Sequence, residues 1–69
     1  MAVRYFVDEQ AQANGDHEVH KQSCAWLATA EQTKDLGQHL SCHAAVLAAR
    51  RWFPKANGCA RCSAACHTS

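Results

Sequence analysis

The sequence lacks the large apolar side chains that usually fill a protein core. Of its 69 residues, 48% are hydrophobic, but much of that share is alanine and cysteine, and only 7% are aromatic. A chain this short buries a modest fraction of its surface and usually needs disulfides, a metal ion or a partner to fold stably. We therefore expect a single small domain, residues 1–69, held together by an additional cross-link.

The sequence also lacks a strong net charge and a long apolar run. Its formal net charge is +1, so a nucleic-acid partner is only weakly supported, and we expect an unknown protein partner instead. No apolar run approaches the length of a membrane span, which argues against a membrane partner. Residues 1–8 lack the apolar stretch and cleavage site of a signal peptide. These absences predict a cytoplasmic location.

The five cysteines favour metal binding over a disulfide framework. Their number is odd, so they cannot all pair within one chain. In a reducing compartment, cysteines serve as metal ligands or redox thiols more often than as disulfides. Cys42 falls on the apolar face of a predicted helix, and we interpret it as a buried small apolar residue.

The first half of the chain has the pattern of a β-hairpin. Residues 3–7 are β-branched or aromatic apart from one arginine, which predicts a short strand. Residues 14–16, Asn-Gly-Asp, are a strong turn signal, and residues 18–20 resemble a return strand. We expect residues 28–38 to be mostly loop, with a short third strand near Leu36.

The second half predicts one helix. Ser41 is a favourable N-cap for a helix over residues 42–53, and Pro54 ends it. An apolar stripe at three- and four-residue spacing would face the core; its members are Cys42, Ala45, Val46, Ala49, Trp52 and Phe53. The fold class is therefore α+β. We expect a two- to three-stranded antiparallel sheet packed on one helix, with a C-terminal cysteine-rich knuckle and a metal ion as the cross-link.

Two pairs of candidate metal ligands stand out. They are His20-x3-Cys24 and, after an Asn-Gly turn, Cys59-x2-Cys62. Zinc prefers four sulfur or nitrogen donors in a tetrahedron, usually supplied as two closely spaced pairs. The helix lies between the pairs, so one ion bound to both would join the hairpin, the helix and the C-terminal segment. The sequence thus predicts a Zn²⁺ site with these four ligands.

The C-terminal segment leaves an alternative ligand set open. Cys59, Cys62, Cys66 and His67 fall within nine residues and could supply four donors alone. Either Cys66 or His67 could also replace His20 as a ligand. If Cys66 is not a ligand, we expect it to be a spare thiol near the site.

The arrangement of these residues resembles a known zinc-binding domain. The resemblance rests on His20-x3-Cys24, Leu36-Gly37, the alanine-rich helix 44–49, Pro54 and Cys59-x2-Cys62. It is similar to the small N-terminal zinc domain of Ada-type DNA alkylation-response proteins, and also to short bacterial Cys/His proteins. The resemblance implies a bacterial source, a small sheet with one helix, and the four ligands named above. In Ada-type domains the residue that corresponds to His20 is a cysteine, which accepts a methyl group. Because His20 replaces it, methyl transfer is not expected.

These features predict a binding or interaction module stabilised by zinc, rather than an enzyme. A thiolate-rich ligand set makes zinc a weaker Lewis acid, and only Glu18 is a nearby carboxylate in the sequence. The alternative is a thiol-redox protein that uses Cys59-x2-Cys62, with Cys66 as the resolving thiol. Cysteines near a helix N-terminus have a lowered pKa and become reactive, which would suit that chemistry.

Overall fold

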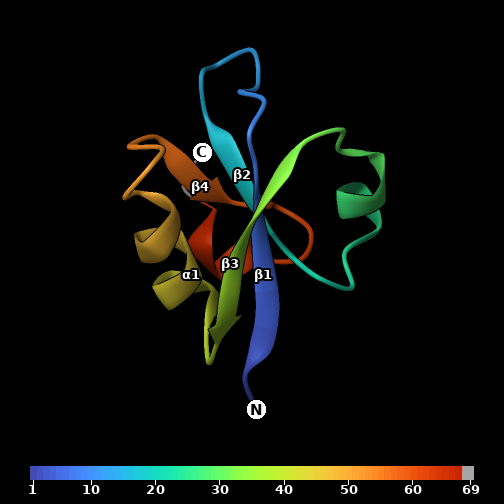
Figure 1. Ribbon diagram of the computed structural model, residues 1–69, viewed down its shortest axis with the longest axis vertical. Helices are drawn as coiled ribbons and strands as arrows, with labels where there is room; N and C mark the ends of the chain where they lie inside the picture. Colours follow the sequence, from blue (N-terminus) through green and yellow to red (C-terminus); the bar gives the residue numbers. More distant parts are fainter. Residues whose placement is uncertain (68–69) are drawn as a thin grey trace.

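The chain begins with the predicted β-hairpin. β1 (Val3–Asp8) and β2 (His17–Lys21) pair antiparallel, with Phe6 opposite His20 and Val7 opposite Val19. The connecting turn contains Gly15 at a positive φ of 89°. The computed structural model describes residues 1–67, and Figure 1 shows the hairpin at the centre of the molecule.

The sheet has four strands in the order β3-β1-β2-β4. β3 (Thr33–His39) pairs antiparallel with β1, whereas β4 (Ala56–Gly58) pairs parallel with β2. The sequence predicted an antiparallel sheet of two to three strands, so the α+β class is confirmed and the sheet is larger and mixed. β4 was not expected because Asn57-Gly58 has the composition of a turn. In the structure the Asn57 amide donates to Asp16 Oδ2 at 3.3 Å, which holds this short strand beside the hairpin.

β3 is longer than the short strand expected near Leu36, and it contains a β-bulge. Tyr5 faces Gly37 while Phe6 faces Asp35, so Leu36 is the extra residue. Gly37 has a φ of 81°, a conformation that other residues adopt only at a cost. The Gly37 N–H donates to Asp35 Oδ1 at 2.7 Å, which stabilises the bulge.

Helix α1 (Cys42–Ala49) begins where predicted and ends early. Ser41 is the N-cap, and its hydroxyl accepts from the Ala44 N–H at 3.4 Å. The chain leaves the helix through a turn at Arg50, well before the predicted end at Phe53. Trp52 is consequently 52% exposed and does not continue the apolar stripe, although Phe53 packs against the core.

The apolar core lies between α1 and one face of the sheet. Tyr5 and Val7 of β1 and Val19 of β2 contribute to it, and α1 covers them with small side chains. The remaining buried members are Leu36, Cys42, Ala45, Val46, Ala49, Ala56 and Cys66. Figure 1 shows α1 and the C-terminal segment on the same side of the molecule, away from the 3-10 segment η1 (Ala25–Thr29). Within residues 1–67, no helix has the length and apolar character required to cross a membrane.

Candidate metal centre

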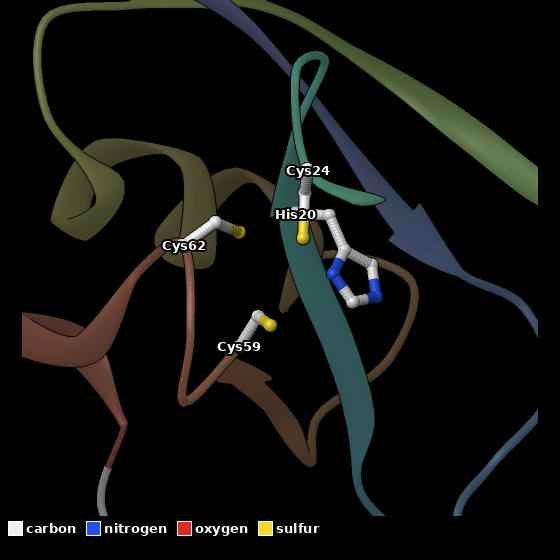
Figure 2. Close-up of side chains that lie close together, drawn as sticks. All are labelled: His20, Cys24, Cys59 and Cys62. Atoms are coloured by element: carbon white, nitrogen blue, oxygen red, sulfur yellow. The ribbon is translucent and has the colours of Figure 1, made fainter. Parts of the chain in front are cut away.

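The four side chains predicted as ligands come together in the structure. His20 lies in β2, Cys24 precedes η1, and Cys59 and Cys62 follow β4. One donor atom from each residue lies within 4.8 Å of all the others. Figure 2 shows the three sulfur atoms and the imidazole ring directed toward a common centre. This cluster could hold a metal ion.

The parallel pairing of β2 with β4 places the two halves of the cluster side by side. Val19 faces Gly58 in the register, and the Cys59 N–H donates to the Val19 carbonyl at 3.0 Å. Successive side chains on a strand point to opposite faces. Since Val19 points into the core, His20 points to the other face of the sheet. The cluster therefore forms on the face that α1 does not cover.

His20 has an unsatisfied buried nitrogen. Its side chain is 2% exposed, and Nδ1 is the buried side-chain polar atom without a hydrogen-bond partner among residues 1–67. The other ring nitrogen, Nε2, lies 3.7 Å from Glu18 Oε1. Burial lowers the pKa of His20, although the charges of Glu18 and Asp8 oppose that shift. A neutral imidazole has a free lone pair, and a bound metal ion would satisfy this nitrogen.

The surroundings of Cys24 favour its thiolate. Burial raises the pKa of this thiol, but the backbone N–H groups of Trp26 and Leu27 and the neighbouring thiols lower it by more. The net result is a pKa below the ordinary value. Amide donors at the start of η1 thus compensate negative charge on the Cys24 sulfur, as they do around metal-bound thiolates.

Cys62 shows the opposite tendency. Burial, and to a smaller extent the nearby thiols of Cys24 and Cys59, raise its pKa to about 11, although hydrogen bonds with Ser63 and Lys21 lower it. The Lys21 N–H donates to the Cys62 sulfur at 3.3 Å. Three thiols packed together cannot all ionise without a compensating cation. A bound metal ion would supply that charge and deprotonate its cysteine ligands.

The donor set of three sulfur atoms and one imidazole nitrogen suits a thiophilic ion. Cys3His is a usual ligand set of structural zinc sites, which are closed and tetrahedral. The hard ions magnesium and calcium prefer oxygen donors and are disfavoured here. The residues present therefore fit the predicted zinc ion.

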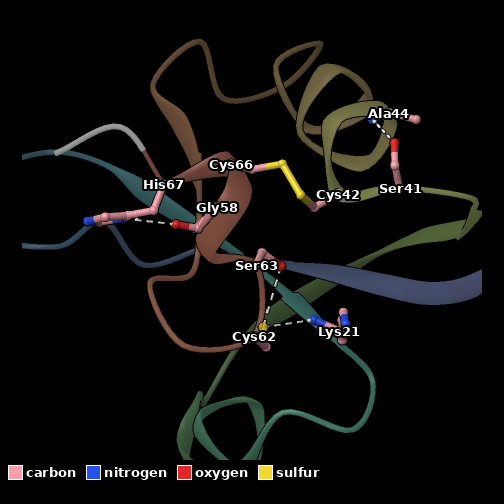
Figure 3. Close-up of a disulfide and its surroundings, with 9 residues drawn as sticks. All are labelled: Lys21, Ser41, Cys42, Ala44, Gly58, Cys62, Ser63, Cys66 and His67. Carbon is pink, nitrogen blue, oxygen red and sulfur yellow. Dashed lines mark hydrogen bonds between the residues drawn. A yellow bond between two sulfur atoms is a disulfide. The ribbon is translucent and has the colours of Figure 1, made fainter.

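Cys66 is not a spare thiol, and Cys42 is not simply a buried apolar residue. The two form a disulfide between the start of α1 and the short 3-10 segment η2 (Ala64–Cys66). Cys42 is buried in the core, as the sequence predicted, but neither cysteine is a free thiol. An odd number of cysteines excludes complete pairing but still allows one pair. Figure 3 shows the disulfide on the opposite side of the C-terminal segment from Cys62.

The other histidines lie outside the cluster. The Nδ1–H of His67 donates to the Gly58 carbonyl at 3.1 Å (Figure 3), so the structure brings neither His67 nor Cys66 to the four donors. His17 donates to the Asp8 carbonyl at 2.9 Å and stacks on Phe53. His39 donates to the Leu36 carbonyl at 2.7 Å.

Comparison with protein-family models, curated proteins and solved structures finds no match to this chain. The resemblance to the Ada-type zinc domain therefore stays a prediction. The function of the cluster has to be argued from its own chemistry.

Proposed function

We propose that this chain is a small binding module without catalytic activity, stabilised by one Zn²⁺ ion bound to His20, Cys24, Cys59 and Cys62. The observation that carries the proposal is the convergence of four donor atoms within 4.8 Å, one of them on a buried residue with an unsatisfied nitrogen. Four protein ligands complete a tetrahedron. They leave no coordination position for a substrate or a reactive water, which favours a structural role over a catalytic one.

A structural ion suits the thin core of this domain. The apolar core occupies one face of the sheet and is built largely from alanine, valine and cysteine. On the other face, the ion would connect the end of β2 with the segment that follows β4. Such cross-links stabilise small domains that bury too little apolar surface to fold alone.

The surface that a partner would contact lies beside the cluster. Trp26, in η1, is 49% exposed, and the Arg61 guanidinium lies over its ring, 5.5 Å from the centroid. Both residues border a hollow of about 280 Å³ that Cys59 and Glu18 also line. Tryptophan and arginine contribute strongly to protein interfaces. Because Cys24 precedes η1 and Arg61 lies between Cys59 and Cys62, metal binding would fix both side chains in position.

Metal analysis tests the proposed zinc centre. Purified protein in its disulfide form should contain one zinc per chain, and the cadmium-113 signal of the substituted protein should have the shift expected for three thiolate ligands. His20→Ala should weaken metal binding, whereas the matched control His67→Ala should bind normally. A preparation that folds but takes up no zinc would refute the proposal. Loss of binding in His67→Ala alone would favour the alternative ligand set.

A thiol-redox function is the second candidate, and the Cys42–Cys66 disulfide is the observation that favours it. In that case Cys59 and Cys62 would form a second, reversible disulfide, without Cys66 as the resolving thiol. Mass mapping of disulfides after mild oxidation of the metal-free protein tests this function. The redox function requires that a Cys59–Cys62 disulfide forms and that a dithiol reduces it again.

A further inference from the structure

A second group of metal-binding side chains lies at the start of α1. Cys42 and His43 occupy the first turn of the helix, and Cys66 ends η2. One donor atom of each lies within 4.8 Å of the others. The two sulfur atoms are joined in a disulfide (Figure 3) and are not available as thiolates in that state.

We propose that reduction of the Cys42–Cys66 disulfide creates a second metal site, which binds a thiophilic divalent ion such as zinc or cadmium through Cys42, His43 and Cys66. A dithiol reductant gives two electrons and two protons to the S–S bond and becomes a disulfide itself. The products are two thiols. Binding of the divalent ion to both thiolates and to neutral His43 then releases two protons.

The backbone around this group keeps the two cysteines close after the S–S bond is broken. Their Cα atoms are 6.2 Å apart. Cys42 is fixed by the capped helix, and the Cys66 N–H donates to the Ser63 carbonyl at 2.8 Å. Small rotations of the side chains can therefore separate the sulfur atoms enough to accept an ion between them.

The set of two sulfur atoms and one nitrogen leaves the fourth coordination position open. Cys2His with a water ligand is a known zinc arrangement. His43 is exposed, and His43 and Cys66 border a hollow of about 250 Å³ that Val46, Leu47, Arg50 and Ala65 also line. A water molecule or a small ligand could reach the ion through this hollow. The second site would therefore bind metal less tightly than the closed four-ligand cluster and exchange it faster.

The second site shares no donor with the first, so the two can be tested separately. One sample of wild-type protein is loaded with cadmium in its disulfide form, and a second sample is loaded after reduction. The reductant is a phosphine, which is oxidised to the phosphine oxide with oxygen from water. Mass spectrometry establishes the state of the Cys42–Cys66 pair. We expect one cadmium per chain in the disulfide form and two after reduction. The additional cadmium-113 signal should have the lower shift of a two-thiolate site.

Two variants assign the additional signal. In Cys42→Ser/Cys66→Ser under reducing conditions, the number of bound ions should stay at one. In reduced His43→Ala, the affinity of the second site should fall by about tenfold or more, while the first signal is unchanged. His67→Ala is the matched control and should still bind two ions.

The difference in metal content between the two redox states tests the second site. The metal content of the disulfide form alone tests the zinc centre proposed above. Equal metal content in both states would overturn the second site. Persistence of the second signal in the double serine variant would overturn it as well. Loss of the dispersion of amide NMR signals on reduction would also overturn it, because the site needs α1 and η2 in place. A disulfide form without metal would count only against the first centre.

Discussion

Gly58 and Cys66 pack so closely that a Cβ atom at Gly58 would stand 2.6 Å from the Cys66 Cβ. It would also lie 2.9 Å from the Ser63 carbonyl oxygen and from the Cys66 carbonyl carbon. Two of these neighbours are backbone atoms, which cannot move aside cheaply. The C-terminal segment thus folds directly over β4, and this contact fixes the turn that carries Cys59 and Cys62.

Replacement of this glycine should be costly. In Gly58→Ala the added methyl group would push η2 away from β4, and we expect a loss of roughly 1–3 kcal/mol in the free energy of unfolding. Urea denaturation of the metal-loaded protein measures the loss. Ala60→Ser, at an exposed position two residues away, is the control and should unfold like the wild type. A Gly58→Ala variant of normal stability would show that the contact can relax.

Removal of the metal should destabilise the fold and change the environment of Trp26. An ion that binds only the folded state contributes about 4 kcal/mol when its free concentration is a thousand times Kd. Chelation should therefore lower Tm. In a Trp52→Phe background it should also shift the fluorescence of Trp26, whose backbone N–H donates to the Cys24 sulfur. Unchanged fluorescence and Tm after verified metal removal would contradict a structural ion.

Loss of the disulfide should cost stability independently of the first metal centre. The bond closes a loop with a sequence separation of 24. On the chain-entropy model, a loop of this length contributes about 3.5 kcal/mol. We expect Cys42→Ala/Cys66→Ala to lose that amount in urea denaturation without reductant. In the presence of a chelator, reduced wild-type protein should show a similar loss relative to the disulfide form in the same chelator. If the variant were as stable as the disulfide form, the bond would not constrain the chain.

The bulge in β3 predicts a dependence of stability on pH. The hydrogen bond from the Gly37 N–H lowers the pKa of Asp35 below its ordinary value, and the Arg4 guanidinium makes the next largest contribution. The Arg4 Nη1 lies 2.7 Å from Asp35 Oδ2. Asp35 therefore binds a proton more readily in the unfolded state than in the folded state. The ionised side chain stabilises the fold fully above the ordinary aspartate pKa of about 4, and this stabilisation is lost as the pH falls. The stability difference between wild type and Asp35→Asn should shrink over that acid range. The exposed Glu31→Gln is the control, and a difference that does not depend on pH would contradict the assignment.

Local patterns in the sequence predicted the elements that form from neighbouring residues. The alternation of Val3, Tyr5 and Val7 and the cap at Ser41 correspond to β1 and to the start of α1. The spacing of the two ligand pairs also identified the residues that the structure brings together. The structure shows that these residues could hold a metal ion.

The features that the sequence did not predict depend on distant contacts. β4 contains only Ala56, Asn57 and Gly58, and it becomes a strand because β2 lies beside it. The Cys42–Cys66 disulfide depends on the return of the C-terminal segment to the start of α1. Pro54 disfavours helical geometry only at Phe53, whereas the helix already ends at Ala49. The residues that follow turn toward β4, and the Arg50 Nε–H donates to the Ala56 carbonyl at 3.4 Å.

The parallel pairing of β2 and β4 has a consequence for the folding rate. The hairpin forms from nearby residues, but the β2–β4 contact closes a long loop, and the entropy of that closure opposes early pairing. In the unfolded chain, His20-x3-Cys24 and Cys59-x2-Cys62 are each short enough to chelate an ion locally. An ion held by one ligand pair can then bind the other ligand pair. This brings the ends of the loop between β2 and β4 together before the two strands align. The metal concentration should then affect the speed of folding as well as the stability of the folded domain.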